Sequence, residues 1–149
     1  MRTWTATTTV EAPPDAVLDL LTDPHAIASW APVDFEVTEL ESDRLAPGAR
    51  PRVEGRLAGV SVGFEVEVLA AGEEGLALRA AGPVAFDVRY DLEPAAGGSE
   101  VRASVGVQPG RGFRGRILAE ATSALLSAGA LQTALDRIGR CVAATPIAA

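Results

Sequence analysis

Lysine is absent from this sequence of 149 residues, and cysteine, histidine, tyrosine and methionine occur once each. All 13 basic residues are arginines, and with 20 Asp and Glu residues the net charge is −7. Nucleic acids and anionic membrane surfaces both require clustered positive charge, so this balance argues against both as partners. A single cysteine, Cys141, excludes an internal disulfide. The lone His25, far from Cys141 in the chain, makes no recognisable zinc site, so we expect no metal and no cofactor.

Long apolar runs are also missing. The longest are far shorter than a membrane-spanning helix, and the first residues alternate between polar and apolar, unlike a signal peptide. We therefore expect no membrane insertion and a cytoplasmic location. A hydrophobic fraction of 48% and a charged fraction of 22% fit one globular domain over residues 1–149. Arginine without lysine, together with abundant Ala, Gly and Pro, is typical of a GC-rich bacterial genome.

Alternation of polar and apolar residues predicts seven strands. Residues 2–12 alternate, and so do six later segments that short turns separate: 35–40, 51–59, 61–70, 76–82, 84–94 and 99–109. Short turns favour antiparallel neighbours, and the alternation predicts a sheet with one wet and one buried face. Acidic residues and prolines predict two short helices between the first two strands, one beginning at Pro14 and one over 24–29.

A single long helix is predicted from about Phe113 to Ala143. Its core-facing stripe recurs in steps of three and four: Ile117, Ala121, Ala124, Ala128, Leu131, Leu135, Ile138 and Val142. Leucine and isoleucine fill the roughly 10 Å between packed layers, whereas alanine does not. Either the helix approaches the sheet at the three alanines, or a hollow remains there. We favour a hollow, because a sheet that curls around one helix cannot easily close onto its middle while Leu131, Leu135 and Ile138 hold the end of the helix away. An apolar hollow costs stability, so three alanines on one face are best understood if an apolar guest fills the space.

The expected lining combines inward-facing strand positions with the helix. It comprises Trp30, Phe35, Val62, Phe64, Val66, Phe86, Val88, Tyr90, Val105, Ala121, Ala124, Leu125, Ala128 and Gln132. Tyr90 is the one inward phenol; its hydroxyl either meets a backbone group or donates to a ligand carbonyl, and Gln132 is a second candidate polar group. Trp30 is either core or a gate to the pocket. Tyr90 and Asp34 are the candidate groups for proton transfer if a reaction takes place.

The order of these pieces resembles the polyketide cyclase/dehydrase-like branch of the START-like (SRPBCC) superfamily. Three pieces carry the resemblance: Ala12-Pro13 followed by Val17, Trp30-x-Pro32, and Tyr90-x-Leu92-x-Pro94 followed by Gly97-Gly98. It implies an α+β helix-grip fold, in which a seven-stranded antiparallel sheet wraps around a long C-terminal helix and encloses a pocket for hydrophobic molecules. Lipid carriers, hormone receptors and cyclases share this fold, so the fold does not determine the function.

The resemblance also allows the expected pocket to be compared with that of the family's cyclases. Aromatic polyketide cyclases of this family place polar groups, often arginine and tyrosine, inside the pocket. In this sequence the strand arginines fall on the outward phase: Arg52, Arg56, Arg79, Arg89 and Arg102. This departure argues against a cyclase.

The segment "GRGFRG", residues 110–115, matches a dinucleotide-binding pattern. That site needs a strand after the helix, and no strand is predicted there. The segment is either a solvated loop or a cationic rim at the pocket mouth.

Three functions stay open from the sequence. The first is a protein that binds a hydrophobic, polyketide-like or polycyclic small molecule. The second is a polyketide cyclase or dehydratase that acts mainly by positioning its substrate. The third is a structural domain with a filled core and a protein partner. The sequence leaves the oligomeric state open.

Overall fold

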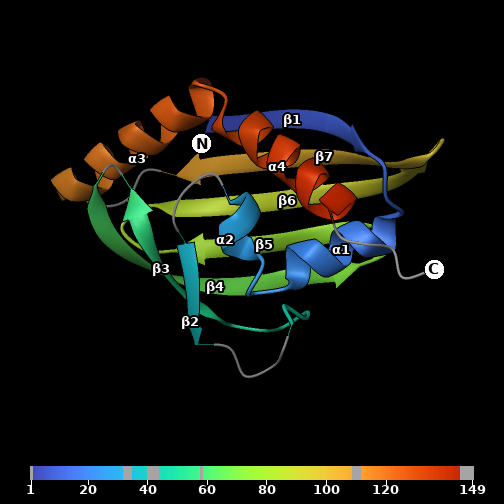
Figure 1. The fold of residues 1–149 in the computed structure, drawn as a ribbon. Helices are drawn as coiled ribbons and strands as arrows, with labels where there is room; N and C mark the ends of the chain where they lie inside the picture. The colour runs from blue at the N-terminus through green and yellow to red at the C-terminus, as the bar shows by residue number, and fades with distance from the viewer. Residues whose placement is uncertain (1, 32–34, 40–43, 58, 109–111, 145–149) are drawn as a thin grey trace.

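A computed structural model describes residues 2–31, 35–39, 44–57, 59–108 and 112–144. Within these residues, seven antiparallel strands form one sheet in the order β1-β7-β6-β5-β4-β3-β2 (Figure 1). The strands are β1 (Arg2–Val10), β2 (Phe35–Glu39), β3 (Arg52–Leu57), β4 (Val60–Gly72), β5 (Gly75–Ala81), β6 (Ala85–Ala95) and β7 (Gly98–Gln108). The helices are α1 (Pro14–Thr22), α2 (Ile27–Trp30), α3 (Gly112–Ser127) and α4 (Ala130–Ala144). The predicted α+β helix-grip fold is confirmed, with the two short helices between β1 and β2.

The alternation read from the sequence sets the two faces of the sheet. In β6, Phe86, Tyr90 and Leu92 are buried while Arg89 is exposed. The other strand arginines predicted to face outward are exposed as well: Arg52, Arg56, Arg79 and Arg102. One face of the sheet is therefore charged and wet, and the helices lie over the other face (Figure 1).

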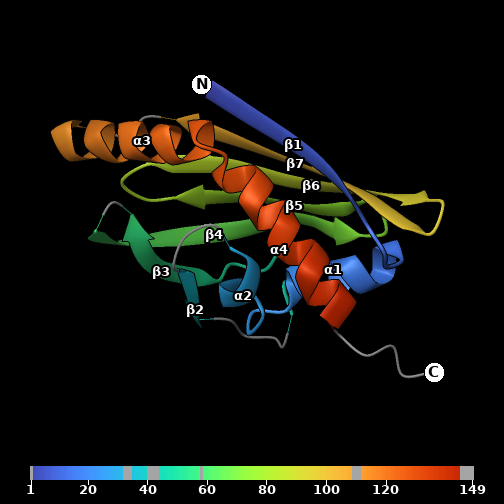
Figure 2. The same cartoon turned by 45° about the horizontal axis from the view of Figure 1, so that its top comes forward.

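The single long helix predicted at the C-terminus is wrong: two helices, α3 and α4, meet at Gly129. Gly129 has a φ of 96°, in the left-handed region that glycine reaches without a Cβ penalty. Its N–H donates to the Leu126 carbonyl at 3.2 Å, and its own carbonyl accepts from Thr133 at 3.0 Å. A helix that ends on a left-handed glycine cannot continue in the same direction. Figure 2 shows α4 leaving α3 at a clear angle.

The break at Gly129 puts α3 and α4 out of phase. The predicted stripe holds for α4, where Leu131, Leu135, Ile138 and Val142 are buried. In α3 a different face is buried, made of Gly115, Leu118, Ala119, Thr122, Ser123 and Leu126. Ile117, Ala124 and Ala128 are exposed and Ala121 is half-buried. The alanines therefore do not face the sheet. The left-handed Gly129 interrupts the helix, so the helical phase of α4 does not continue back into α3.

The helices cover the sheet unevenly. Helix α4 packs mainly on β1, the edge strand, and on α1 and α2. Its residues Ala134, Leu135 and Ile138 are inaccessible to solvent, so this half of the core is filled. The candidate site lies over the middle of the sheet, β4 to β6, where only the first residues of α4, Ala130 and Leu131, take part. No helix in the described residues is long and apolar enough to cross a membrane.

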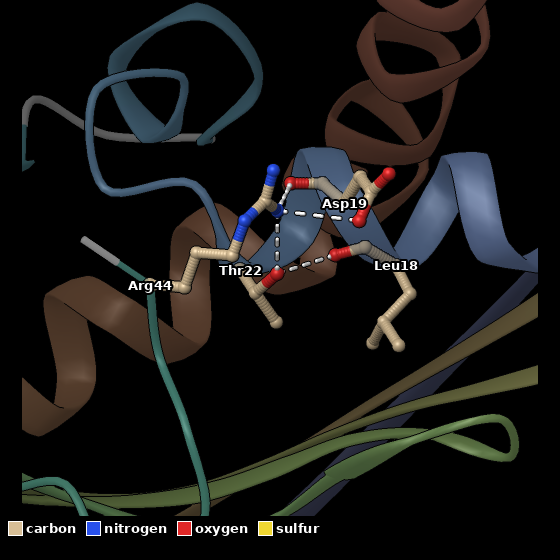
Figure 3. Close-up of polar contacts among 4 residues, drawn as sticks. All are labelled: Leu18, Asp19, Thr22 and Arg44. Carbon is tan, nitrogen blue, oxygen red and sulfur yellow. Dashed lines mark hydrogen bonds and ion pairs between the residues drawn. The ribbon is translucent and has the colours of Figure 1, made fainter. Parts of the chain in front are cut away.

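Arg44, which lies outside the sheet, bonds to α1 beside one wall of the candidate site (Figure 3). The Arg44 guanidinium donates to the Asp19 carbonyl at 3.2 Å and pairs with its carboxylate at 3.3 Å. It also lies 3.5 Å from the Thr22 hydroxyl, which in turn donates to the Leu18 carbonyl at 2.8 Å. A cation at the C-terminal end of α1 suits the helix dipole. The next residue, Leu45, donates its N–H to the Thr22 carbonyl, and its side chain is buried.

Candidate ligand cavity

A cavity of about 190 Å³, partly open to solvent, lies between the middle of the sheet and the helices. Its floor is formed by β4, β5, β6 and β7 through Phe64, Val66, Leu76, Leu78, Ala80, Phe86, Val88, Tyr90 and Val105. Its walls come from three regions: Leu21, Ile27, Trp30 and Ala31 of the α1–α2 region; Phe35, Val37, Leu45, Pro51 and Val53 of β2, β3 and the segment between them; and Thr122, Leu125, Leu126, Ala130 and Leu131 around the α3–α4 junction. The lining is almost entirely apolar. An engineered apolar cavity of about 150 Å³ stays dry and binds benzene, so this one is large enough for an apolar guest.

Aromatic residues, scarce in the chain, are concentrated at this cavity. Of four Phe, two Trp and one Tyr, five line it. Phe64 contacts Phe35 edge-on with ring centroids 6.0 Å apart, and Phe86 in a tilted arrangement at 5.3 Å. Trp30 and Tyr90 form a second edge-on pair at 5.7 Å. Such pairs add about 0.5–1.5 kcal/mol each beyond burial of area, so they stiffen the wall.

The structure places the predicted lining residues in two groups. Nine of them line the cavity: Trp30, Phe35, Phe64, Val66, Phe86, Val88, Tyr90, Val105 and Leu125. Five do not: Val62, Ala121, Ala124, Ala128 and Gln132. Val62 is buried elsewhere, and the alanines are turned away by the phase change at Gly129. The Gln132 side chain is exposed and donates to Asp136 at 3.3 Å, so it offers no polar group to the cavity.

One α3 residue of the lining, Leu125, was predicted from the sequence, and two others, Thr122 and Leu126, were missed. Thr122, Leu125 and Leu126 line the cavity in place of the alanines. The sequence carried one signal for this arrangement, the Ala-Gly-Ala run at 128–130, because glycine after an apolar stripe is typical of a helix end. Leu125 lines the cavity and is nevertheless 39% exposed, which places it at the opening.

Three polar side chains line the cavity: Trp30, Tyr90 and Thr122. The Thr122 hydroxyl donates to the Leu118 carbonyl at 2.7 Å, so its hydrogen is already used. The Trp30 Nε1 is buried and has no hydrogen-bond partner among the described residues. Leaving a buried donor unpaired costs about 1–3 kcal/mol.

Tyr90 is the one ionisable residue in the lining described here. Its side chain is buried, and desolvation raises the pKa of the phenol well above its ordinary value of 10.0. The phenol therefore stays protonated at neutral pH and acts as a hydrogen-bond donor. Asp34, the other candidate for proton transfer, lies outside the described residues.

The remaining motifs lie away from the cavity lining. Gly112 opens α3 with a φ of 77°, and Arg114 donates to the Ser61 carbonyl at 3.2 Å across to β4. A second helix follows α3 in place of the strand that a dinucleotide site requires, and residues 110 and 111 of the segment lie outside the described residues. His25 is exposed, and Cys141 lies 3.6 Å from the Ser29 hydroxyl. Within the described ranges no three His, Cys, Asp or Glu side chains gather closely enough to hold a metal ion.

Comparison with solved structures gives the same fold from several bacteria. The Thermus thermophilus protein TTHA0849 superposes with a TM-score of 0.74 at 18% identity, covering 97% of this chain and 100% of that one. The Chromobacterium violaceum protein CV1439 gives 0.70 at 18% identity, covering 95% and 97%. A Rhodobacter sphaeroides protein gives 0.68 at 19% identity, covering 97% and 95%. At this identity the likeness shows the fold alone.

The family follows from the sequence match. No curated protein compared with the chain matches it. Residues 1–140 match the family described as polyketide cyclase / dehydrase and lipid transport, and this match covers nearly the whole chain and every residue that lines the cavity. This chain therefore belongs to the polyketide cyclase / dehydrase and lipid transport family of the SRPBCC type.

Proposed function

We propose that this protein binds a hydrophobic small molecule, polyketide-like or polycyclic, in the cavity between β4–β6 and the helices. The observation that carries the proposal is the contrast within one core. Under α4 the residues are packed without accessible surface, whereas beside it about 190 Å³ is left among aromatic and aliphatic side chains. Unfilled apolar volume costs about 24 cal/mol per Å³ in mutant series, a cost that a bound guest offsets.

Simple binding is favoured over catalysis by the chemistry of the lining. A cyclase or dehydratase requires a group that accepts a proton from the substrate. A phenol is already protonated at neutral pH and burial raises the pKa of Tyr90 further, while the Trp30 indole N–H can only donate. The arginines of β3, β5, β6 and β7, which could stabilise an enolate, lie on the opposite, exposed face of the sheet. The described residues therefore hold and orient a guest.

The test is to identify a bound molecule. Protein purified from its own host is examined by native mass spectrometry before and after extraction with organic solvent, and the extracted protein is titrated with the neutral dye Nile red. We expect a mass increment that extraction removes and a saturable blue shift of the dye at one site. Absence of the increment, together with dye binding no greater than to a filled-core protein, would leave the family fold without this function.

A further inference from the structure

Trp30, which lines the cavity, carries an unpaired hydrogen-bond donor. Trp30 is 7% exposed, its Nε1 is buried, and no acceptor among the described residues reaches it. Buried polar groups in native proteins nearly always have a partner, and an exception calls for an explanation. A bound molecule that supplies the acceptor is such an explanation.

A second donor is carried by a ring that packs against the Trp30 ring. The rings of Trp30 and Tyr90 meet edge-on, with an angle of 81° between their planes. No hydrogen bond joins the Tyr90 hydroxyl to another residue in the part of the chain that the structure describes. The two packed rings therefore bring an indole N–H and a phenol O–H to one region of an otherwise apolar lining.

The same wall excludes a charged acceptor. Its lining contains no arginine, histidine, aspartate or glutamate among the described residues. A carboxylate placed there would lose its water without gaining a counter-ion, which is far more costly than burying a neutral carbonyl.

We propose that the guest is an uncharged apolar molecule with a carbonyl-type oxygen, and that Trp30 Nε1 and the Tyr90 hydroxyl bind that oxygen. This inference rests on the proposed function and adds the chemical class of the ligand. Because Nε1 is covered by its neighbours, the indole ring shifts when the acceptor arrives.

The test compares three molecules with the same ring system: acetylnaphthalene, ethylnaphthalene and naphthoate. Their affinities for the whole chain are measured by Nile red displacement. One hydrogen bond to an otherwise unpaired donor predicts that acetylnaphthalene binds about tenfold more tightly than ethylnaphthalene. Naphthoate, which must lose its hydration shell, should bind more weakly than either.

The indole N–H signals provide a readout that does not depend on a variant. The chain has two tryptophans, so the nitrogen–proton correlation spectrum contains two indole signals, and Trp4→Phe identifies them. Trp4 lies on β1, outside the lining, with Arg2 over its ring. Acetylnaphthalene should move the Trp30 signal downfield, further than ethylnaphthalene does, and should leave the Trp4 signal in place.

Trp30→Phe removes the donor and keeps an aromatic ring. It should reduce the tenfold preference for the ketone over the hydrocarbon, because only the Tyr90 hydroxyl is left to bind the oxygen, whereas Trp4→Phe should preserve it. If acetylnaphthalene and ethylnaphthalene bind equally and move the Trp30 signal alike, the inference is overturned while the binding function stands. If naphthoate binds best, the neutral acceptor is wrong. If none of the three displaces the dye, the proposed function fails and the inference with it.

Discussion

Replacing Val88 by phenylalanine should fill the cavity from its floor. Val88 lies in the middle of β6, opposite Leu78 and Val105, and all three side chains line the cavity. The substitution adds four carbons. At about 0.8 kcal/mol per buried carbon they would stabilise the fold by about 3 kcal/mol, and strain of about 1–3 kcal/mol opposes this. We therefore expect the unfolding free energy to change by less than about 2 kcal/mol.

The matched control is Val101→Phe. Val101 lies on the same face of the sheet in β7, has no accessible surface and does not line the cavity. The same four carbons find no space there, so overpacking of about 1–3 kcal/mol or more is not offset. At about 2–4 °C per kcal/mol for a domain of this size, its melting temperature should fall by several degrees.

The assay combines thermal melting with titration of ethylnaphthalene. Val88→Phe should bind the hydrocarbon at least tenfold more weakly than the original chain, with a melting temperature within about 8 °C. A loss of stability as large as that of Val101→Phe would mean that the space beside Val88 is already occupied. Unchanged affinity in a well-folded Val88→Phe would mean that the guest binds elsewhere. Either result refutes the reasoning.

Three further predictions concern stability and the redirected α3 face. Because Tyr90 ionises more readily once unfolded, stability should be lost as pH rises above about 10, by up to about 1.4 kcal/mol per pH unit. With no lysine and no other tyrosine in the chain, Tyr90→Phe should abolish most of this fall in alkaline urea denaturation; an equal fall in both proteins would contradict the burial of the phenol. Gly129→Ala should lower the free energy of unfolding by about 1–2 kcal/mol, because the φ of Gly129 is positive. Gly139→Ala should raise it by up to about 1 kcal/mol, because Gly139 lies inside α4 and an added Cβ would meet Val10 at an ordinary contact distance. The opposite order in chemical denaturation would argue for one continuous helix. Ala124→Phe should leave the affinity for ethylnaphthalene unchanged because Ala124 is exposed, and a tenfold loss in the same titration would restore the alanine face to the cavity.

The sequence predicted the strands well because each strand carries its own two-residue alternation. The inward positions Phe64, Val66, Phe86 and Tyr90 followed from that alternation alone, and the structure buries all four. Because each strand carries its own alternation, an error in the bounds of one strand does not change the inward and outward positions predicted for the next.

The α3 face could not be predicted in the same way. A three-to-four periodicity gives the phase of a helix only while the backbone stays helical, and one left-handed residue, Gly129, resets it. The stripe carried forward to Leu131 is correct, and the stripe carried back to Ala124 is wrong. The cavity was thus predicted for a reason that does not hold. Helix α4 packs mainly on β1, helix α1 contacts β4, β5 and β6, and the α1–α2 region and the α3–α4 junction enclose the cavity over these strands.

The central claim is that an apolar guest occupies this cavity, and intermolecular nuclear Overhauser effects test it most directly. With methyl-labelled protein and ethylnaphthalene, we predict contacts from the ring protons to methyl groups of Val88, Val105 and Leu131. The methyl groups of Val101 and Leu135, buried outside the lining, should show none. Contacts confined to exposed residues such as Ile117 and Leu69, or no contacts at saturating ethylnaphthalene, would contradict the account.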